Sequence, residues 1–192
     1  LRQENNRGNM IFSGRNGYNV TILALNGSGS GNNAEGFSNT GNGLVTFTGD
    51  IWGEGNNAQT LTITATGEMV LTGNITATAT TNQAAFTKAG TGSLTIQGTA
   101  GTFNGSASIN AGTLNISSIG ALNAAATNAG RAVLGGGTLN YTGGGETWTN
   151  KVVLLNNANS ILTNNGTGAL VLPQNVGNNG TGAKNLVFGG SN

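Results

Sequence analysis

Hydrophobic residues alternate with threonine or asparagine in short segments along most of this chain. Clear examples are residues 61–65 (LTITA), 94–97 (LTIQ) and 139–142 (LNYT), with glycine or another small residue close to each end. A period of two residues is typical of β-strands with one buried face, and glycine and asparagine adopt the backbone conformations that tight turns need. Helical periodicity is nearly absent, and the alanine run inside residues 120–128 predicts at most a single turn. We therefore expect an all-β protein.

The predicted strands also repeat. A glycine followed by x-aliphatic-x-apolar recurs along the chain, and five of its positions are Gly67, Gly92, Gly112, Gly137 and Gly168. Successive glycines of this series are separated by roughly 20 to 30 residues, which is typical of a parallel sheet coiled into a solenoid. An antiparallel sandwich has strands of similar length but gives no reason for such a repeat. The sequence predicts one parallel β-helix over residues 1–192 with rungs of about 20–25 residues, clearest in residues 61–192 and less regular in residues 1–60.

The composition agrees with a stacked coil. The chain has 35 Gly, 31 Asn and 27 Thr, and only 7% of its residues are charged, against about 25% in an ordinary domain. In a solenoid, like residues lie above like residues, so aliphatic side chains form inner columns while asparagine and threonine form hydrogen-bonded ladders. Equal charges stacked a few ångströms apart repel one another, so a low charge content is expected.

The same composition excludes several classes of function. There is no Cys and no His, which removes thiolate and imidazole catalysis, ordinary zinc sites and disulfides. The seven basic residues are scattered and the net charge is +1, so no basic stripe is available for nucleic acid. The longest apolar runs, such as residues 151–155, are too short to span a membrane. We therefore expect no enzyme activity, no cofactor and no metal. Because the sequence has neither a start Met nor a signal peptide, we also expect it to be an excerpt from a longer polypeptide.

One stretch resembles a known family repeat. Residues 86–98 (FTKAGTGSLTIQG), followed by Phe103-Asn104-Gly105 and residues 108–116 (SINAGTLNI), are similar to the autotransporter-associated β-strand repeat. The match covers residues 86–116 with nearly every landmark in place, and it departs from the pattern at Ser93, where threonine is commoner, and at Phe103, where tyrosine is usual. Residues 120–122 and 136–139 are a weaker match, residues 151–172 are weaker again, and residues 1–60 agree only in composition.

The resemblance implies a passenger segment of a type V secreted protein of a Gram-negative bacterium, folded as a right-handed parallel β-helix and held at the cell surface by an outer-membrane anchor elsewhere in the chain. A non-enzymatic stalk, filament or adhesin segment is then the expected function. Its partners would be neighbouring rungs of the same chain, end-to-end copies, or glycans and host ligands at a surface. Neither nucleic acid nor membrane insertion by this segment is expected.

Few residues remain as candidates for ligand contact. Asp50 and Glu54 are the only close pair of carboxylates, and Trp52 lies between them, so the pair would flank a sugar stacked on the indole. The plainer interpretation is a turn with solvated acids. One pair falls short of the clusters that sugar-cleaving enzymes and Ca²⁺ sites need, but a carbohydrate-active enzyme stays the alternative. A glycan-binding or ice-binding face is a third hypothesis, which would use Trp52, Trp148, Tyr141 or the threonine rows of residues 60–64 and 76–80.

Overall fold

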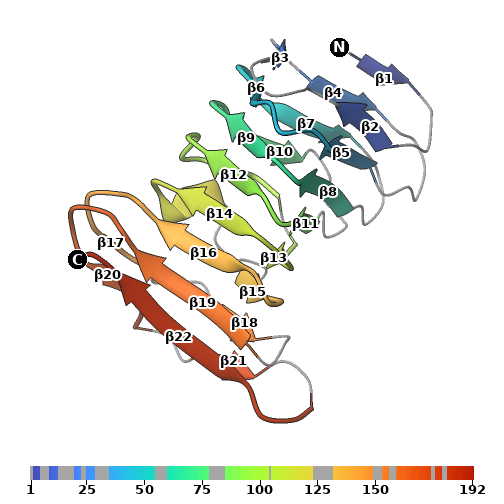
Figure 1. The fold of residues 1–192 in the computed structure, drawn as a ribbon. Helices are drawn as coiled ribbons and strands as arrows, with labels where there is room; N and C mark the ends of the chain where they lie inside the picture. The colour runs from blue at the N-terminus through green and yellow to red at the C-terminus, as the bar shows by residue number, and fades with distance from the viewer. Residues whose placement is uncertain are drawn as a thin grey trace.

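The computed structural model describes residues 2–4, 9–12, 20–22, 25–28, 35–54, 60–77, 85–103, 105–122, 132–148, 153–155, 159–173, 176–178 and 181–192. Within these residues the protein is all-β, with parallel strands stacked as a β-solenoid (Figure 1). The predicted fold class is confirmed. The one helical element among the described residues is a 3₁₀ turn at Ile119–Ala121, at the start of the region where a single turn was expected. Residues 123–130 lie outside the described residues.

Two long sheets run the length of the stack. The first sheet contains, in spatial order, β2 (Asn9–Phe12), β5 (Glu35–Asn39), β8 (Thr60–Ala65), β11 (Ala85–Ala89), β13 (Ala107–Ile109), β15 (Ala132–Leu134), β18 (Val153–Leu155) and β21 (Gly177–Asn178). The second contains β3 (Val20–Ile22), β6 (Val45–Phe47), β9 (Glu68–Leu71), β12 (Ser93–Ile96), β14 (Thr113–Ile116), β16 (Thr138–Tyr141), β19 (Asn159–Asn164) and β22 (Asn185–Gly190). Each successive rung adds one strand to both sheets.

Two shorter sheets complete the rungs. One contains β1 (Arg2–Glu4), β4 (Leu25–Ser28), β7 (Ile51–Glu54) and β10 (Ile75–Ala77), and the other pairs β17 (Glu146–Thr147) with β20 (Leu170–Val171). The four-stranded sheet comes from residues 2–77 and the two-stranded sheet from residues 146–171. Residues 9–47 already contribute strands to both long sheets. Figure 1 shows the rungs following one another in chain order.

The register of the second sheet confirms four of the five predicted repeats. Glu68 pairs with Ser93, Ser93 with Thr113, and Thr113 with Thr138, so the glycines before these residues occupy equivalent places. The fifth repeat, at Gly168, was predicted wrongly. Leu139 pairs with Leu162 instead of Leu170, because residues 160–162 carry the buried-exposed-buried alternation.

Gly168 instead belongs to a corner of the solenoid. A Cβ atom placed on it would come within 1.9 Å of the Gly144 carbonyl oxygen, so only glycine fits at this close approach of two backbones. Leu170, which the sequence pattern had placed in the inner column, pairs with Glu146 in the two-stranded sheet. Strand β20 ends at Val171, two residues before Pro173, as expected of a residue without a backbone N–H.

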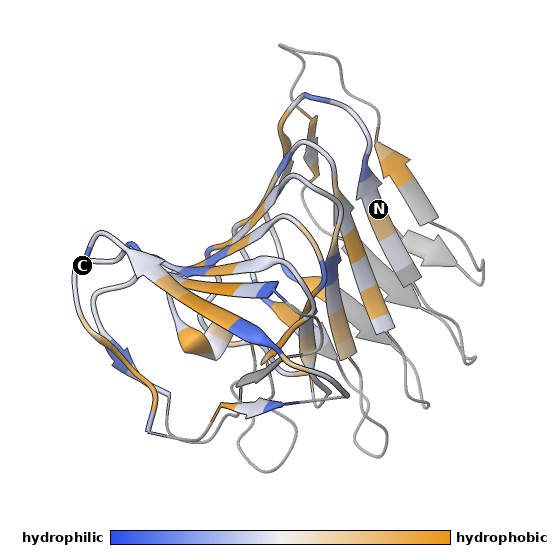
Figure 2. Cartoon of the chain, turned by 60° about the horizontal axis from the view of Figure 1, so that its bottom comes forward, coloured by the Kyte–Doolittle hydropathy of each residue, from blue (hydrophilic) through white to orange (hydrophobic). Residues whose placement is uncertain are grey.

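The core is a set of apolar columns parallel to the solenoid axis. In the second sheet one column consists of residues in register from rung to rung, all at most 3% exposed: Val45, Met69, Leu94, Leu114, Leu139 and Leu162. Figure 2 shows the corresponding alternation of hydrophobic and hydrophilic positions along the strands. Burial of such columns between successive rungs is the main source of stability in a solenoid.

A polar ladder runs along the outer face of the second sheet. The Asn115 side-chain amide donates to the Thr95 hydroxyl at 3.2 Å, and the Asn140 amide donates to Asn115 Oδ1 at 2.8 Å. The Thr163 hydroxyl and the Asn165 amide both donate to Asn140 Oδ1, at 2.8 and 2.9 Å. The predicted asparagine and threonine ladders are therefore present on this face, where they connect four successive rungs.

Candidate functional site

Asp50, the first of the predicted ligand residues, is engaged within the corner that leads into β7. Its Oδ1 accepts hydrogen bonds from the backbone N–H of Asn74 at 2.7 Å and from the Asn74 side-chain amide at 3.3 Å. Asn74 Oδ1 in turn accepts from the backbone N–H of Ala100 at 2.9 Å. The Asp50 carboxylate thus begins a series of hydrogen bonds that connects the corners of three rungs, and its Oδ1 is occupied by these bonds.

Trp52 and Glu54 are placed by their backbone in β7, and their side chains lie outside the described residues. Trp52 pairs with Asn26 of β4 on one side and Thr76 of β10 on the other. The three predicted residues therefore lie within one short stretch of a single rung. The ligand contact predicted for Trp52 and Glu54 stays a prediction.

The other aromatic candidates lie in the core. Trp148 and Tyr141 are each 1% exposed, so neither presents a ring face to a glycan at the surface. The Tyr141 hydroxyl accepts the backbone N–H of Gly145 at 3.0 Å and so holds a corner. The Trp148 indole N–H is buried without a hydrogen-bond partner among the described residues.

The threonine rows occupy ordinary strand positions. Thr60, Thr62 and Thr64 alternate in β8 with the buried residues Leu61, Ile63 and Ala65 and are themselves half-buried. Of the second row, Thr76 is half-buried at the centre of β10, and residues 78–80 lie outside the described residues.

Lys88 is the most unusual polar residue of the described structure, although the sequence pattern had not singled it out as a site. Its side chain is fully buried and occupies an inner column of the first sheet, in register with Ile63 on one side and Ile109 on the other. The Nζ atom donates to the carbonyl oxygens of Ala89 and Gly90, both at 2.8 Å, and of Ala111 at 3.1 Å. Three backbone carbonyls therefore surround one ammonium group.

Two glycines shape the corner that receives this ammonium. Gly90 has φ of 76° and Gly112 has φ of 63°, a region that residues with a side chain rarely adopt. A Cβ atom on Gly112 would also lie 2.9 Å from Lys88 Nζ, so a larger residue would displace the ammonium. Burial lowers the pKa of Lys88 to about 8, because a charged ammonium is poorly solvated away from water.

Glu146 is a second carboxylate used within the fold. Its Oε1 accepts the hydroxyl of Ser118 at 2.8 Å, and its Oε2 accepts the backbone N–H of Ile119 at 2.6 Å. Since Ser118 is the N-cap of the 3₁₀ turn, Glu146 completes the cap from a neighbouring rung. Asp50 and Glu146 thus both bind donors of adjacent corners.

The described residues form no further candidate site for a metal ion. They contain no group of three or more acidic, cysteine or histidine side chains able to hold a metal ion. No helix in this part of the chain is both long and apolar enough to cross a membrane.

Comparisons with known proteins add no assignment. No family model matches the chain, and neither a curated protein nor a solved structure is significantly similar to it.

Proposed function

We propose that this chain is a stalk segment of a secreted bacterial surface protein of the autotransporter type, and that it extends and presents more distal regions without catalysing a reaction. The observation that carries the proposal is the stretch 86–116, whose family-like landmarks coincide with the corner that holds the buried Lys88 ammonium. Lys88, Gly90 and Gly112 of that motif are the residues that build the corner.

The fold suits extension because every rung repeats the previous one in the same direction. All strand pairs among the described residues are parallel, and the strands of both long sheets follow chain order, so length is added along one axis by adding rungs. Stability in such a structure is a sum over rungs and their interfaces. A segment of this kind spans distance without needing a catalytic centre.

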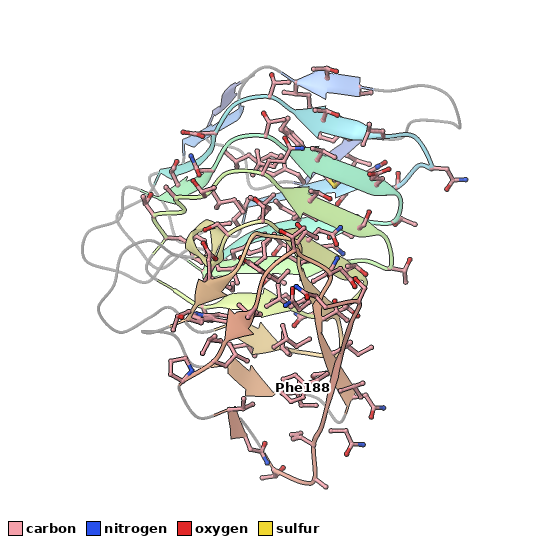
Figure 3. The ribbon with its side chains drawn as sticks, turned by 90° about the vertical axis from the view of Figure 1, so that its left-hand side faces the viewer. Phe188 is labelled. Atoms are coloured by element: carbon pink, nitrogen blue, oxygen red, sulfur yellow. The ribbon has the colours of Figure 1, made fainter. Side chains whose placement is uncertain are left out.

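The partners we propose are further rungs, either of the same polypeptide or of another copy placed end to end. Phe188 supports this proposal. It pairs with Leu162 and so stands in line with the inner column, but it is 65% exposed. Figure 3 shows it among the last layers of the stack. A further rung against β22 would bury it together with the unpaired backbone groups of that strand.

Surface display is tested in the bacterium that makes the full-length protein. Gly144 is exposed and a Cβ atom there meets nothing within 4 Å, so Gly144→Cys introduces a unique thiol in a segment without cysteine. The proposal predicts that a membrane-impermeant maleimide labels this thiol on intact cells. Leu139→Cys, which replaces a buried side chain, is the matched control and should stay unlabelled until the protein is unfolded. Labelling of Gly144→Cys only after lysis would refute surface display.

Absence of catalysis is tested separately with the acidic pair. Asp50→Asn and Glu54→Gln keep the shapes of both side chains while removing their charges. If glycan cleavage were detected in the wild-type protein and lost in either variant, the carbohydrate-active alternative would replace the stalk. We expect no cleavage in any of the three proteins.

A further inference from the structure

Among the described residues, the interior of the solenoid contains one charged side chain. The buried polar or charged residues of the described structure are Ser38, Asn39, Lys88 and Ser160, and Lys88 alone among them is charged. Two of its three carbonyl partners, at Ala89 and Gly90, belong to its own corner, whereas Ala111 belongs to the corner of the next rung. One side chain therefore connects two successive rungs from the inside.

The third carbonyl comes from the corner that follows β13. The corner between β13 and β14 contains only residues 110–112, and its left-handed Gly112 closely approaches the Gly90 carbonyl. The Ala111 carbonyl is thereby brought within reach of Nζ. We call residues 88–92 and 109–113 the Lys88 corner.

Asparagine makes a similar connection elsewhere in the same row of corners. The Asn39 amide donates to the carbonyls of Gly43, in its own corner, and of Glu68, in the next rung, at 2.9 and 3.0 Å. The Asn178 amide donates to the Gly182 carbonyl at 3.3 Å. The amide of asparagine does not titrate, whereas the ammonium of Lys88 does, with a pKa that burial lowers to about 8. The Lys88 corner is thus the titratable version of a recurrent arrangement.

The surroundings of the ammonium are neutral. The strands packed on either side, β8 and β13, place Ile63 and Ile109 in register with Lys88, and the two adjoining corners contribute backbone carbonyls. Glu68 is the charged residue at the start of β9, just after the neighbouring corner, and its side chain is exposed. No described carboxylate hydrogen-bonds to Nζ, so nothing in the described structure compensates the charge except the three carbonyl dipoles.

We propose that the Lys88 corner is a pH-sensitive element of the solenoid, which opens to water more readily while the buried ammonium is charged and closes more firmly once it has lost its proton. The direction follows from linkage. Burial lowers the pKa of Lys88 to about 8, whereas a solvated lysine in the opened corner has a pKa of about 10.4. Between these values the open state binds more protons than the closed state, so the closed state gains stability as the pH rises from about 8 towards 10.

The test uses the absence of native cysteine. Ile109→Cys places one buried thiol beside Lys88, and Leu139→Cys places another in the second sheet, away from this corner. The rate of alkylation by iodoacetamide, divided by the rate for the urea-unfolded protein at the same pH, reports how often each site opens. The proposal predicts that this ratio falls about tenfold for the Ile109→Cys thiol between about pH 8 and 9.5. The fall follows because the pKa of Lys88 is about 8 in the closed corner and about 10.4 in the open one. The ratio for the Leu139→Cys thiol should change much less.

Matched variants isolate the lysine. In the Ile109→Cys background, Lys88→Gln keeps an amide donor for the carbonyls but does not titrate, so the pH dependence should vanish. Lys184→Gln changes a half-buried lysine that donates to the Thr181 carbonyl at the corner before β22, and the tenfold fall should persist.

A second readout is the ¹³Cε chemical shift of Lys88 in the protein without engineered cysteines, which should titrate near the lowered pKa of about 8. Equal pH profiles with and without Lys88, or a Lys88 titration near the ordinary lysine value of about 10.4, would overturn the proposal. Neither readout depends on surface display, so the stalk and the pH-sensitive corner can fail separately.

Discussion

Replacing Leu114 by alanine tests the inner column of the second sheet at its middle. Leu114 is fully buried, between Leu94 on the preceding rung and Leu139 on the following one. The substitution removes about three methylene-sized groups from the core, worth about 2–2.5 kcal/mol of transfer free energy. The spacing of the rungs is fixed by backbone hydrogen bonds in the parallel strands on both sides, so the site cannot collapse and the cavity adds a further cost of about 1–2 kcal/mol.

We therefore expect the free energy of unfolding of Leu114→Ala to fall by about 3–4.5 kcal/mol. Thr113→Ala is the matched control on the same strand, because Thr113 is half-buried on the outer face and should cost less than about 1 kcal/mol. Urea unfolding followed by far-ultraviolet circular dichroism measures both changes, with equal slopes required for the comparison. If Leu114→Ala were no more destabilising than Thr113→Ala, the assignment of inner and outer faces would be refuted.

Two further predictions concern the outer ladder and the last strand. Asn140→Asp replaces the amide that donates to Asn115 Oδ1 at 2.8 Å by a carboxylate oxygen, so it should lower stability by about 1–2 kcal/mol at neutral pH. The loss should shrink below about pH 4, where the carboxyl regains a proton, and an equal loss in thermal melts at both pH values would contradict the ladder. Phe188→Ser should reduce self-association at high concentration in sedimentation velocity, because the exposed ring no longer offers an apolar contact; unchanged association would exclude β22 as the contact.

The strands and most of the register could be predicted from the sequence because both depend on local alternation and on a repeating interval. Four glycines at the predicted intervals do precede paired strands. The repeat at Gly168 was predicted wrongly because a glycine at a corner and a glycine before a strand are followed by similar apolar residues. The alternation at residues 160–162 was the better signal, since it keeps Leu162 above Leu139.

The side-chain contacts at the corners could not be predicted in the same way. Asp50 was recognised as a carboxylate, but its partner Asn74 belongs to the next rung, and the pairing depends on the register of the rungs. Lys88 did carry a signal in the sequence. It is a single charged residue at a position where the period of two requires an apolar one, in a chain with only seven basic residues. In a nearly uncharged sequence, such a residue indicates a buried ammonium with carbonyl partners.

Disulfide formation between engineered cysteines tests the in-register stacking of rungs most directly. Thr138 lies opposite Ile161, and adjacent strands place Cα atoms about 4.8 Å apart, within the range that a disulfide spans. The sequence repeat would instead have placed Ala169 opposite Thr138, whereas the Ala169 carbonyl accepts the backbone N–H of Glu146 at 3.0 Å. We predict that Thr138→Cys/Ile161→Cys forms an intramolecular disulfide under mild oxidation and that Thr138→Cys/Ala169→Cys does not. The reverse result would contradict the register on which the solenoid, its ladders and the proposed stalk all depend.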